Sequence, residues 1–322
     1  MTPEISIIIP LYNEMEVFQE LINRLDAIIE SSPLSIEVLL IDDGSQDSTT
    51  QLIEEKCLID KNYQGIILSR NFGHQIAVSA GLSNANASKA VMVIDGDLQD
   101  PPELLNDFYE KIKEGYDVAY GIRKKRKEHF LKKIAYSTFY KTLKKTSSIN
   151  IPLDSGDFCM MSRRVVNIIN SMQEESRFVR GMRSWVGFKQ TGVEYNRPKR
   201  AAGDPSYSFK QLVKLALNGY YNFSEFPIQF IKRIASSALL ISLVYFLIVV
   251  YKRLLYNSVP EGFTATLFII IFFAGIQLFA ISIVGEYVTR IFFQVKKRPL
   301  YIIDKKIRDN KIVKTKNLEE YQ

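Results

Sequence analysis

The sequence predicts an α/β protein with a largely parallel sheet, followed by a membrane hairpin. In the first hundred residues, short apolar runs alternate with helical patterns, which is typical of parallel strands joined by right-handed crossovers. After residue 230, two stretches without charged residues, 234–251 and 262–285, are about 18 and about 24 residues long, enough to cross a bilayer core. A chain of 322 residues can hold one large domain and a smaller part.

Four strands are expected in this first part, at 5–9, 38–41, 66–68 and 91–94. Between the first two strands, apolar residues recur at helical spacing and predict an amphipathic helix: Val17, Leu21, Leu25, Ile28 and Ile29. Shorter helices are expected after Asp47 and after His74. We find no internal repeat and no low-complexity linker.

Polar clusters follow each of the four predicted strands, at 10–14, 42–45, 69–73 and 95–100. Each cluster alone is compatible with ordinary turn chemistry. A doubly wound sheet, however, brings the loops at the carboxyl ends of its strands together at one edge, where ligands bind. The four clusters therefore predict a single site.

The cluster at 95–100 is the most informative of the four. Asp95 and Asp97 lie one residue apart at the end of an apolar run, and two such carboxylates can hold Mg²⁺ or Mn²⁺ with positions left open for phosphates. The alternative for an isolated Asp-x-Asp is an acidic turn. The cation site is favoured because the other three polar clusters are expected at the same edge of the sheet.

Charge and cysteine usage narrow the class of protein. The net charge is +7, with dense basic runs at 123–127 and 296–298. Beside the hydrophobic stretches, these runs favour an anionic membrane surface over nucleic acid as the partner. Cys57 and Cys159 are too few for a disulfide framework and suit a reducing compartment. The two histidines are far apart in sequence, so no histidine metal site is expected, and no signal peptide is expected at the N-terminus.

The two uncharged stretches are separated by a short loop around Pro260, which favours a membrane hairpin over two buried core helices. Basic residues flank the pair at 232–233 and 296–298, so both flanks are expected in the cytoplasm and the 252–262 loop outside. Lys252 and Arg253 do not fit this positive-inside rule, because they lie at the end of the pair that is expected outside. Their long side chains would have to extend to the membrane interface. The preceding segment 209–221 is expected to lie in the membrane interface, with a soluble core helix as the alternative.

The motif series resembles glycosyltransferase family 2, and more closely its polyisoprenyl-phosphate glycosyltransferases, the branch with dolichyl-phosphate mannose synthase and the bacterial GtrB type. The resemblance extends over nearly the whole chain. It is carried by the following segments: Ile-Pro-Leu-Tyr-Asn-Glu at 9–14, Asp-Asp-Gly-Ser at 42–45, Ser-Arg-Asn-Phe-Gly at 69–73, Asp-Gly-Asp-Leu-Gln-Asp-Pro-Pro-Glu at 95–103, Ser-Gly-Asp-Phe at 155–158, Arg-Phe-Val-Arg-Gly at 177–181 and Val-Gly-Glu-Tyr at 284–287.

This resemblance implies a GT-A fold that binds a nucleotide sugar of UDP or GDP with Mg²⁺ or Mn²⁺ and transfers the sugar, with inversion, to a polyprenyl monophosphate. By matching position, Asp97 and Gln99 hold the metal, and Asp97 and Asp157 are the catalytic residues. Asp157 is either a general base or a group that positions the sugar or the metal; we favour positioning, because the acceptor phosphate is already ionised. The nucleotide sugar is expected to contact the remaining matched residues: Pro10, Tyr12, Glu14, Asp42, Asp43, Arg70, Asp95 and Gly96.

Arginine forks suit the acceptor phosphate, and four are candidates: Arg180, Arg183, Arg197 and Arg200. A surface ion pair is the alternative for each one. The chain departs from relatives at Gly203–Tyr207, where Ser206 stands in place of a lysine, so Arg200 or Lys210 would have to substitute. Glu286 within the second stretch is expected to pair with Arg290, four residues on.

The resulting division is a cytoplasmic catalytic domain (1–208), interface helices (209–230), two transmembrane helices (231–292) and a cytoplasmic tail (293–322). The expected protein is an integral protein of the bacterial inner membrane, with a homo-oligomer left open. UDP-glucose is the favoured donor; modified arabinose, N-acetylhexosamine and mannose are the alternatives. A processive polysaccharide synthase is disfavoured because the chain lacks a Gln-x-x-Arg-Trp motif, and a non-catalytic scaffold because unliganded carboxylates would repel one another.

Overall fold

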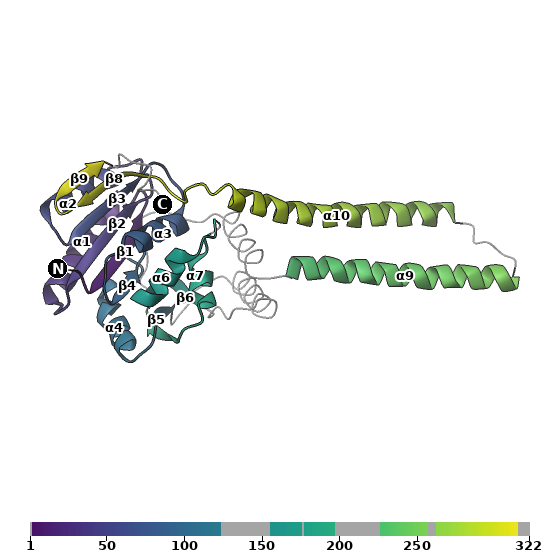
Figure 1. Ribbon diagram of the computed structural model, residues 1–322, viewed down its shortest axis with the longest axis horizontal. Coiled ribbons are helices and arrows are strands. Elements are labelled where there is room, and N and C mark those ends of the chain that lie inside the picture. The colour runs from purple at the N-terminus through teal and green to yellow at the C-terminus, as the bar shows by residue number, and fades with distance from the viewer. Residues whose placement is uncertain (1, 124–154, 176, 197–225, 257–261, 315–322) are drawn as a thin grey trace.

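The computed structural model describes residues 2–123, 155–175, 177–196, 226–256 and 262–314. Within these ranges, a mixed sheet of nine strands is covered by helices on both faces, and two long helices project from it (Figure 1). The strand order is β7-β5-β6-β4-β1-β2-β3-β8-β9.

The centre of the sheet consists of four parallel strands: β1 (Ile5–Leu11), β2 (Ile36–Asp42), β3 (Tyr63–Leu68) and β4 (Ala90–Val93). These are the four strands expected from the apolar runs. β1 and β2 are buried along their whole length because helices cover both faces. Their carboxyl ends meet at one edge, where Leu11 pairs with Asp42.

Helices follow the first three strands, as the sequence predicts: α1 (Met15–Ser31), α2 (Thr49–Ile59) and α3 (His74–Asn84). α1 buries Val17, Leu21 and Leu25 in a core that also includes α2 and α4 (Leu105–Lys113). α3 packs on the opposite face of the sheet, in a second core with α6 (Arg163–Ser171) and α7 (Val179–Trp185). A short 3₁₀ turn, η1 (Pro102–Leu104), leads into α4.

Beyond β4 the sheet changes direction. β6 (Ser155–Ser162) runs antiparallel to both β4 and β5 (Val118–Arg123), and β7 (Gln190–Tyr195) forms the edge, parallel to β5. Because β6 is reversed, its first residues lie at the edge where β1, β2 and β4 end. Cys159 pairs with Val93, so Asp157 lies beyond the end of β4, next to the acidic loop.

The opposite edge contains two strands from the C-terminal part of the chain, β8 (Ile303–Arg308) and β9 (Lys311–Lys314). β8 pairs antiparallel with β3, and a tight turn with positive φ at Asp309 and Asn310 leads into β9. The sequence predicted a cytoplasmic tail at 293–322 and neither of these two strands. Only Ile303 and Ile307 of β8 are buried, and the lysines between them obscure the alternation in the sequence.

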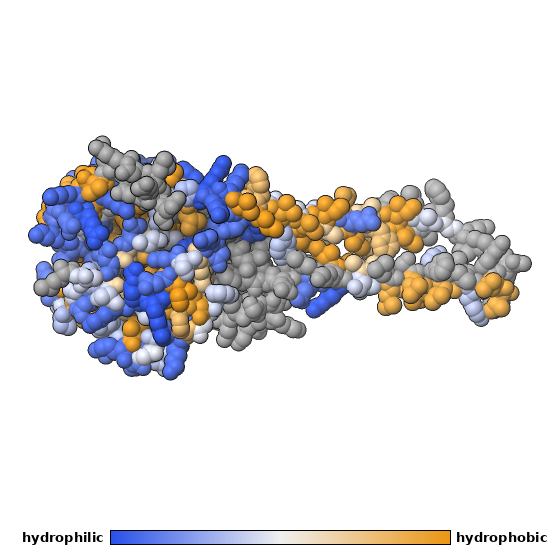
Figure 2. Space-filling view, viewed as in Figure 1, coloured by the Kyte–Doolittle hydropathy of each residue, from blue (hydrophilic) through white to orange (hydrophobic). Residues whose placement is uncertain are grey.

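The two projecting helices, α9 (Phe226–Tyr256) and α10 (Phe263–Val295), lie side by side and run in opposite directions (Figure 1). Apolar side chains are prominent on the visible face of both helices, whereas the visible face of the sheet domain is mostly hydrophilic (Figure 2). One segment of the described chain, Phe272–Val295, is both long and apolar enough to cross a membrane. Glu286 pairs with Arg290 at 2.9 Å on α10, as expected. The predicted interface helix at 209–221 lies outside the described residues.

Candidate active site

Hydrogen bonds connect the loop after β1 to the loop after β2. The backbone N–H of Asn13 donates to Oγ of Ser45 at 3.0 Å, and the N–H of Gln46 donates to Oδ1 of Asn13 at 2.8 Å. Asn13 has a φ of 55°, which asparagine tolerates better than most residues. Of the predicted nucleotide-lining residues, Pro10 is buried within β1, Glu14 is half-buried and Tyr12 is 42% exposed at the rim.

Asp42 and Asp43 use their carboxylates to shape this edge of the sheet. Asp42 is fully buried and accepts hydrogen bonds from the N–H of Ser45 at 2.9 Å and from the hydroxyl of Thr50. Asp43 accepts from the backbone of the β3 loop, from the N–H of Phe72 at 2.8 Å and of Gly73 at 2.9 Å. Burial raises the pKa of Asp43 despite these donors.

Gly44 explains how the β2 and β3 loops approach so closely. Its φ is +71°, and a Cβ at this position would lie 2.5 Å from the carbonyl carbon of Arg70. A glycine is therefore required both for the backbone conformation and for the contact. Arg70 itself is exposed on the rim, where its guanidinium stacks 4.0 Å from the ring centre of Phe72.

The acidic loop after β4 is a tight turn. Oδ1 of Asp97 accepts the N–H of Gln99 at 3.1 Å, and Leu98 has a φ of 59°. Gly96 lies against β1, because a Cβ there would come within 2.4 Å of a methyl group of Leu11. Asp97 and Gln99 are half-buried. No group of three or more His, Cys, Asp or Glu side chains within the described ranges is arranged to hold a metal ion without other ligands.

Asp157 lies at the centre of a cluster of charged and polar side chains. Its Oδ2 accepts a hydrogen bond from Nε2 of Gln75 at 3.0 Å and lies 3.6 Å from Nε2 of His74. Its Oδ1 lies 3.5 Å from Nη2 of Arg180. The same Nε2 of His74 is 3.6 Å from Oδ1 of Asp95. His74 therefore bridges the acidic loop and the start of β6.

The charges in this cluster balance one another. Burial by itself would raise the pKa of Asp157, but Arg180, His74 and Arg183 together hold that pKa well below its usual range. Burial would lower the pKa of His74, but the neighbouring carboxylates of Asp157 and Asp95 raise it to about 9. At neutral pH the structure therefore favours an ionised Asp157 beside a protonated histidine.

The predicted phosphate-binding arginines differ in their accessibility. Arg180 lies on α7 with 18% of its side chain exposed, next to Asp157. Arg183, one turn further on, is 1% exposed; it lies 3.5 Å from the carbonyl oxygen of Gly156 and 5.4 Å from the ring centre of Tyr120. Arg183 thus lies beneath Asp157, as a buried counter-charge. Arg197 and Arg200 lie outside the described residues.

Three site residues were absent from the sequence prediction: His74, Gln75 and Arg123. The first two directly follow the polar cluster at 69–73 and begin α3. Extending that cluster, at the carboxyl end of β3, by two residues would have included them. Nε of Arg123 donates to the hydroxyl of Tyr195 at 3.3 Å, and this hydroxyl donates to Oδ1 of buried Asp100 at 2.6 Å. The sequence placed Arg123 in a basic surface run and gave no sign of this contact.

Most of these groups, although not Arg180, Arg183 or Tyr195, lie in the part of the chain that matches a known family. The sequence profile of Glycosyl transferase family 2 matches residues 6–169, which include the acidic motifs at 42–43 and 95–97 and also Asp157. The chain belongs to glycosyltransferase family 2. It is therefore a glycosyltransferase with the α/β fold of the GT-A type, as the motif series predicted.

Relatives match over nearly their full length. The chain is 42% identical to the uncharacterized glycosyltransferase YkcC of Bacillus subtilis (strain 168), over 93% of each chain. It is 36% identical to the SfII prophage-derived bactoprenol glucosyl transferase of Shigella flexneri, over 95% of this chain and 99% of that protein. Among solved structures, mannosyl-3-phosphoglycerate synthase from Rubrobacter xylanophilus is similar with a TM-score of 0.47 and 15% identity, over 67% of this chain and 71% of that chain.

Proposed function

We propose that this glycosyltransferase moves a sugar, with UDP-glucose as the favoured donor, onto a polyprenyl monophosphate at the cytoplasmic face of the bacterial inner membrane. The observation that carries the proposal is the position of Asp157, between the acidic loop after β4 and Arg180 of α7. This arrangement suits a reaction between two phosphate-bearing molecules. The bactoprenol glucosyl transferase of Shigella flexneri, similar over nearly its full length, supports the same lipid and sugar.

The donor set supports a divalent cation between protein and donor diphosphate. Asp97 and Gln99 offer one carboxylate and one amide oxygen at an accessible turn, and no closed set of protein ligands surrounds them within the described chain. Mg²⁺ commonly binds in this way, through one or two protein oxygens together with phosphates and water. A cation held by Asp97 and Gln99 would supply positive charge to the leaving diphosphate.

In the proposed reaction, an oxygen of the acceptor phosphate attacks C1 of the sugar and forms a new C–O bond. The bond from C1 to the donor diphosphate breaks, and the nucleoside diphosphate leaves with the electron pair, so the anomeric centre inverts. Arg180 would hold the acceptor phosphate through its planar fork. Tyr12 and Arg70, both exposed on the rim, would contact the nucleotide.

The role of Asp157 follows from its charge balance. A carboxylate whose pKa is held far below its usual range is a poor proton acceptor. The acceptor phosphate, in turn, is already largely ionised near pH 7. We therefore assign Asp157 to positioning of the sugar and of the surrounding cations rather than to removal of a proton.

The membrane anchor in this proposal is the α9–α10 pair as a hairpin. β3 precedes the pair in the chain and β8 follows it, yet the two strands are hydrogen-bonded in one sheet. This pairing supports a topology in which both ends of the pair lie on the same side of the membrane, with an even number of crossings between them. The apolar side chains along both helices support two crossings (Figure 2).

A donor screen tests the function. Purified full-length protein with undecaprenyl phosphate is expected to transfer label from UDP-glucose into a lipid extract, to require Mg²⁺ or Mn²⁺, and to lose activity in EDTA. Asp97→Ala should abolish transfer while the protein remains folded and membrane-bound. Asp107→Ala, an exposed position on α4, is the matched control and should retain activity. Transfer from another nucleotide sugar would change the donor, and full activity in EDTA would exclude the metal assignment.

A further inference from the structure

Gln75 connects two parts of the site that lie far apart in the sequence. Its side-chain amide donates from Nε2 to Oδ2 of Asp157 at 3.0 Å and accepts at Oε1 from the backbone N–H of Val179 at 2.9 Å. Asp157 lies at the start of β6, and Val179 is the first residue of α7. A single amide therefore links the central carboxylate to the helix that carries Arg180 and Arg183.

Both partners fix the orientation of this amide. A backbone N–H can only donate, and an ionised carboxylate can only accept, so the amide oxygen must face Val179 and the NH₂ group must face Asp157. Glutamine is suited to this position because it offers one acceptor and one donor on the same rigid group. Glutamate would keep the acceptor and lose the donor, and methionine would lose both.

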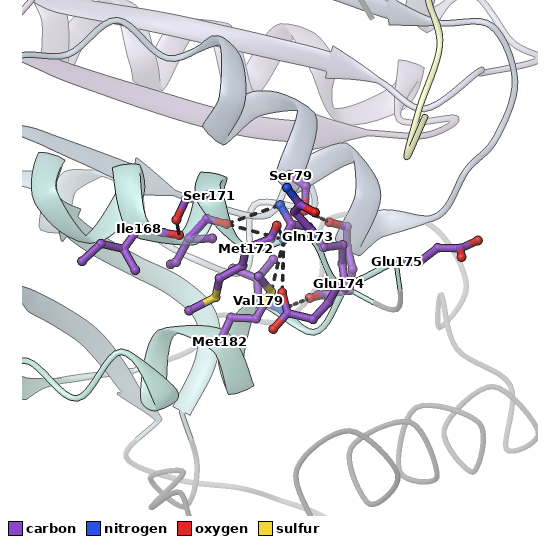
Figure 3. A network of polar contacts seen from close by, with 12 residues as sticks. Ser79, Ile168, Ser171, Met172, Gln173, Glu174, Glu175, Val179 and Met182 are labelled. Carbon is purple, nitrogen blue, oxygen red and sulfur yellow. Dashed lines mark hydrogen bonds and ion pairs between the residues drawn. The ribbon is translucent and has the colours of Figure 1, made fainter. Parts of the chain in front are cut away.

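Gln75 is itself held firmly. It lies in the first turn of α3, and its backbone carbonyl oxygen accepts a hydrogen bond from the hydroxyl of Ser79 at 2.8 Å. Ala77, two residues further along α3, is buried in the same core as Val179 and Met182 of α7. Figure 3 shows Val179 and Met182 near Met172 at the end of α6, with Glu175 pointing away from this junction.

We propose that Gln75 is a positioning residue, which sets the distance between Asp157 and the arginine-bearing helix α7. This inference rests on the proposed function for its kinetic consequences. The amide aligns the sugar-side carboxylate with the acceptor-side cation, and it contacts neither substrate. α3 is part of the sheet domain and begins at His74, which also faces Asp157. Through Gln75, the same helix would therefore set the position of α7.

Two variants of the full-length protein separate the two bonds of Gln75. Gln75→Glu retains the bond to Val179 but places a second negative charge beside Asp157; kcat should fall at least tenfold, with the KM for undecaprenyl phosphate within about twofold of wild type. Gln75→Met loses both bonds, so the KM for the lipid should also rise. Gln19→Glu is the matched control and should behave as wild type, because the Gln19 amide donates to Oδ1 of Asn23 on the exposed surface of α1.

Hydrogen exchange gives a readout that needs no substrate. Amides of 179–185 should exchange faster in Gln75→Met than in wild type, and should be unchanged in Gln75→Glu and Gln19→Glu. Affinity for UDP with Mn²⁺ should be the same in all three variants. Unchanged exchange in Gln75→Met, or wild-type kinetics in Gln75→Glu, would overturn the inference. If wild type itself fails to transfer, the proposed function is wrong, and the exchange of 179–185 still decides whether Gln75 holds α7.

Discussion

His74 and Asp157 show how single residues depend on their partners in this site. Asp157 faces His74, Gln75 and Arg180, while His74 also faces Asp95. Carboxylates this close would repel one another in a half-buried pocket unless cations lay between them. The protonated imidazole and Arg180 serve that purpose in the free protein.

The role of Asp157 can be tested by one isosteric substitution. Asp157→Asn replaces the carboxylate that we assign to positioning the sugar, so we expect weaker binding of UDP-glucose together with at least a tenfold lower rate. Calorimetry of donor binding and initial rates across pH measure both quantities. Unchanged donor affinity, with a lost rate that high pH partly restores, would identify Asp157 as a general base.

The raised pKa of His74 predicts a pH-dependent stability. A folded-state pKa of about 9, against about 6.5 when unfolded, stabilises the fold by up to about 3 kcal/mol, less any screening by water at this partly exposed site. The contribution is fully present below pH 6.5 and is lost as the pH rises through 9. In EDTA, the difference in thermal midpoint between wild type and His74→Gln should therefore be largest near pH 6 and small near pH 10. A difference that is constant over this range would contradict the assignment.

At the scale of elements, β8 is the least expected part of the fold. It extends the sheet beside β3, and its buried Ile307 lies against Gly65, where a Cβ would come within 2.9 Å of an Ile307 methyl carbon. Lys305 adds a salt bridge to Glu54 of α2 at 2.9 Å. The segment after α10 is thus part of the catalytic domain.

This packing predicts a specific loss of stability. Ile307→Ala should destabilise the domain by about 2–5 kcal/mol, because it leaves a cavity in the core. Ile312→Ala in β9, where the side chain is 43% exposed, should change stability by no more than about 0.5 kcal/mol. Thermal unfolding of both variants gives the comparison. Similar small effects from both would mean that β8 is not integral to the domain.

At the scale of the whole molecule, the described connection between the sheet domain and the projecting helices lies at the end of α10, after which the chain continues into β8 of the sheet. There, Oε1 of Gln294 accepts the backbone N–H of Glu175 at 2.9 Å, and its NH₂ group donates to the carbonyl oxygen of Gln173. α10 therefore contacts the segment before α7, the helix that carries Arg180.

Cysteine labelling in intact cells tests the proposed topology. A cysteine introduced at Ser258, between α9 and α10 in the sequence, should react with an impermeant reagent from outside. A cysteine at Val313 in β9, which is 49% exposed, should react only after permeabilisation, because the proposed topology puts the sheet with β8 and β9 in the cytoplasm. The native Cys57 and Cys159 are buried and should contribute little background. Labelling of Val313→Cys but not of Ser258→Cys in intact cells would reverse the model.

The sequence by itself determined the elements whose signal is local. The runs that became β1 to β4 are apolar on both faces, and α1 has a clear helical period, so short stretches were enough to predict them. The carboxyl-end rule then brought the loops after β1, β2, β3 and β4 to one edge. The motifs in those loops predicted the family, which the match over residues 6–169 confirmed.

The tertiary structure decided what depends on distant pairing. The reversal of β6 brings Asp157 to His74 and Gln75 across more than eighty residues of chain, and no local pattern encodes that contact. The same holds for Arg123, which reaches Asp100 through Tyr195, and for β8, whose two buried isoleucines have meaning only beside β3. Whether a charged side chain belongs to a site depends on the groups that surround it, and these groups come together only in the folded chain.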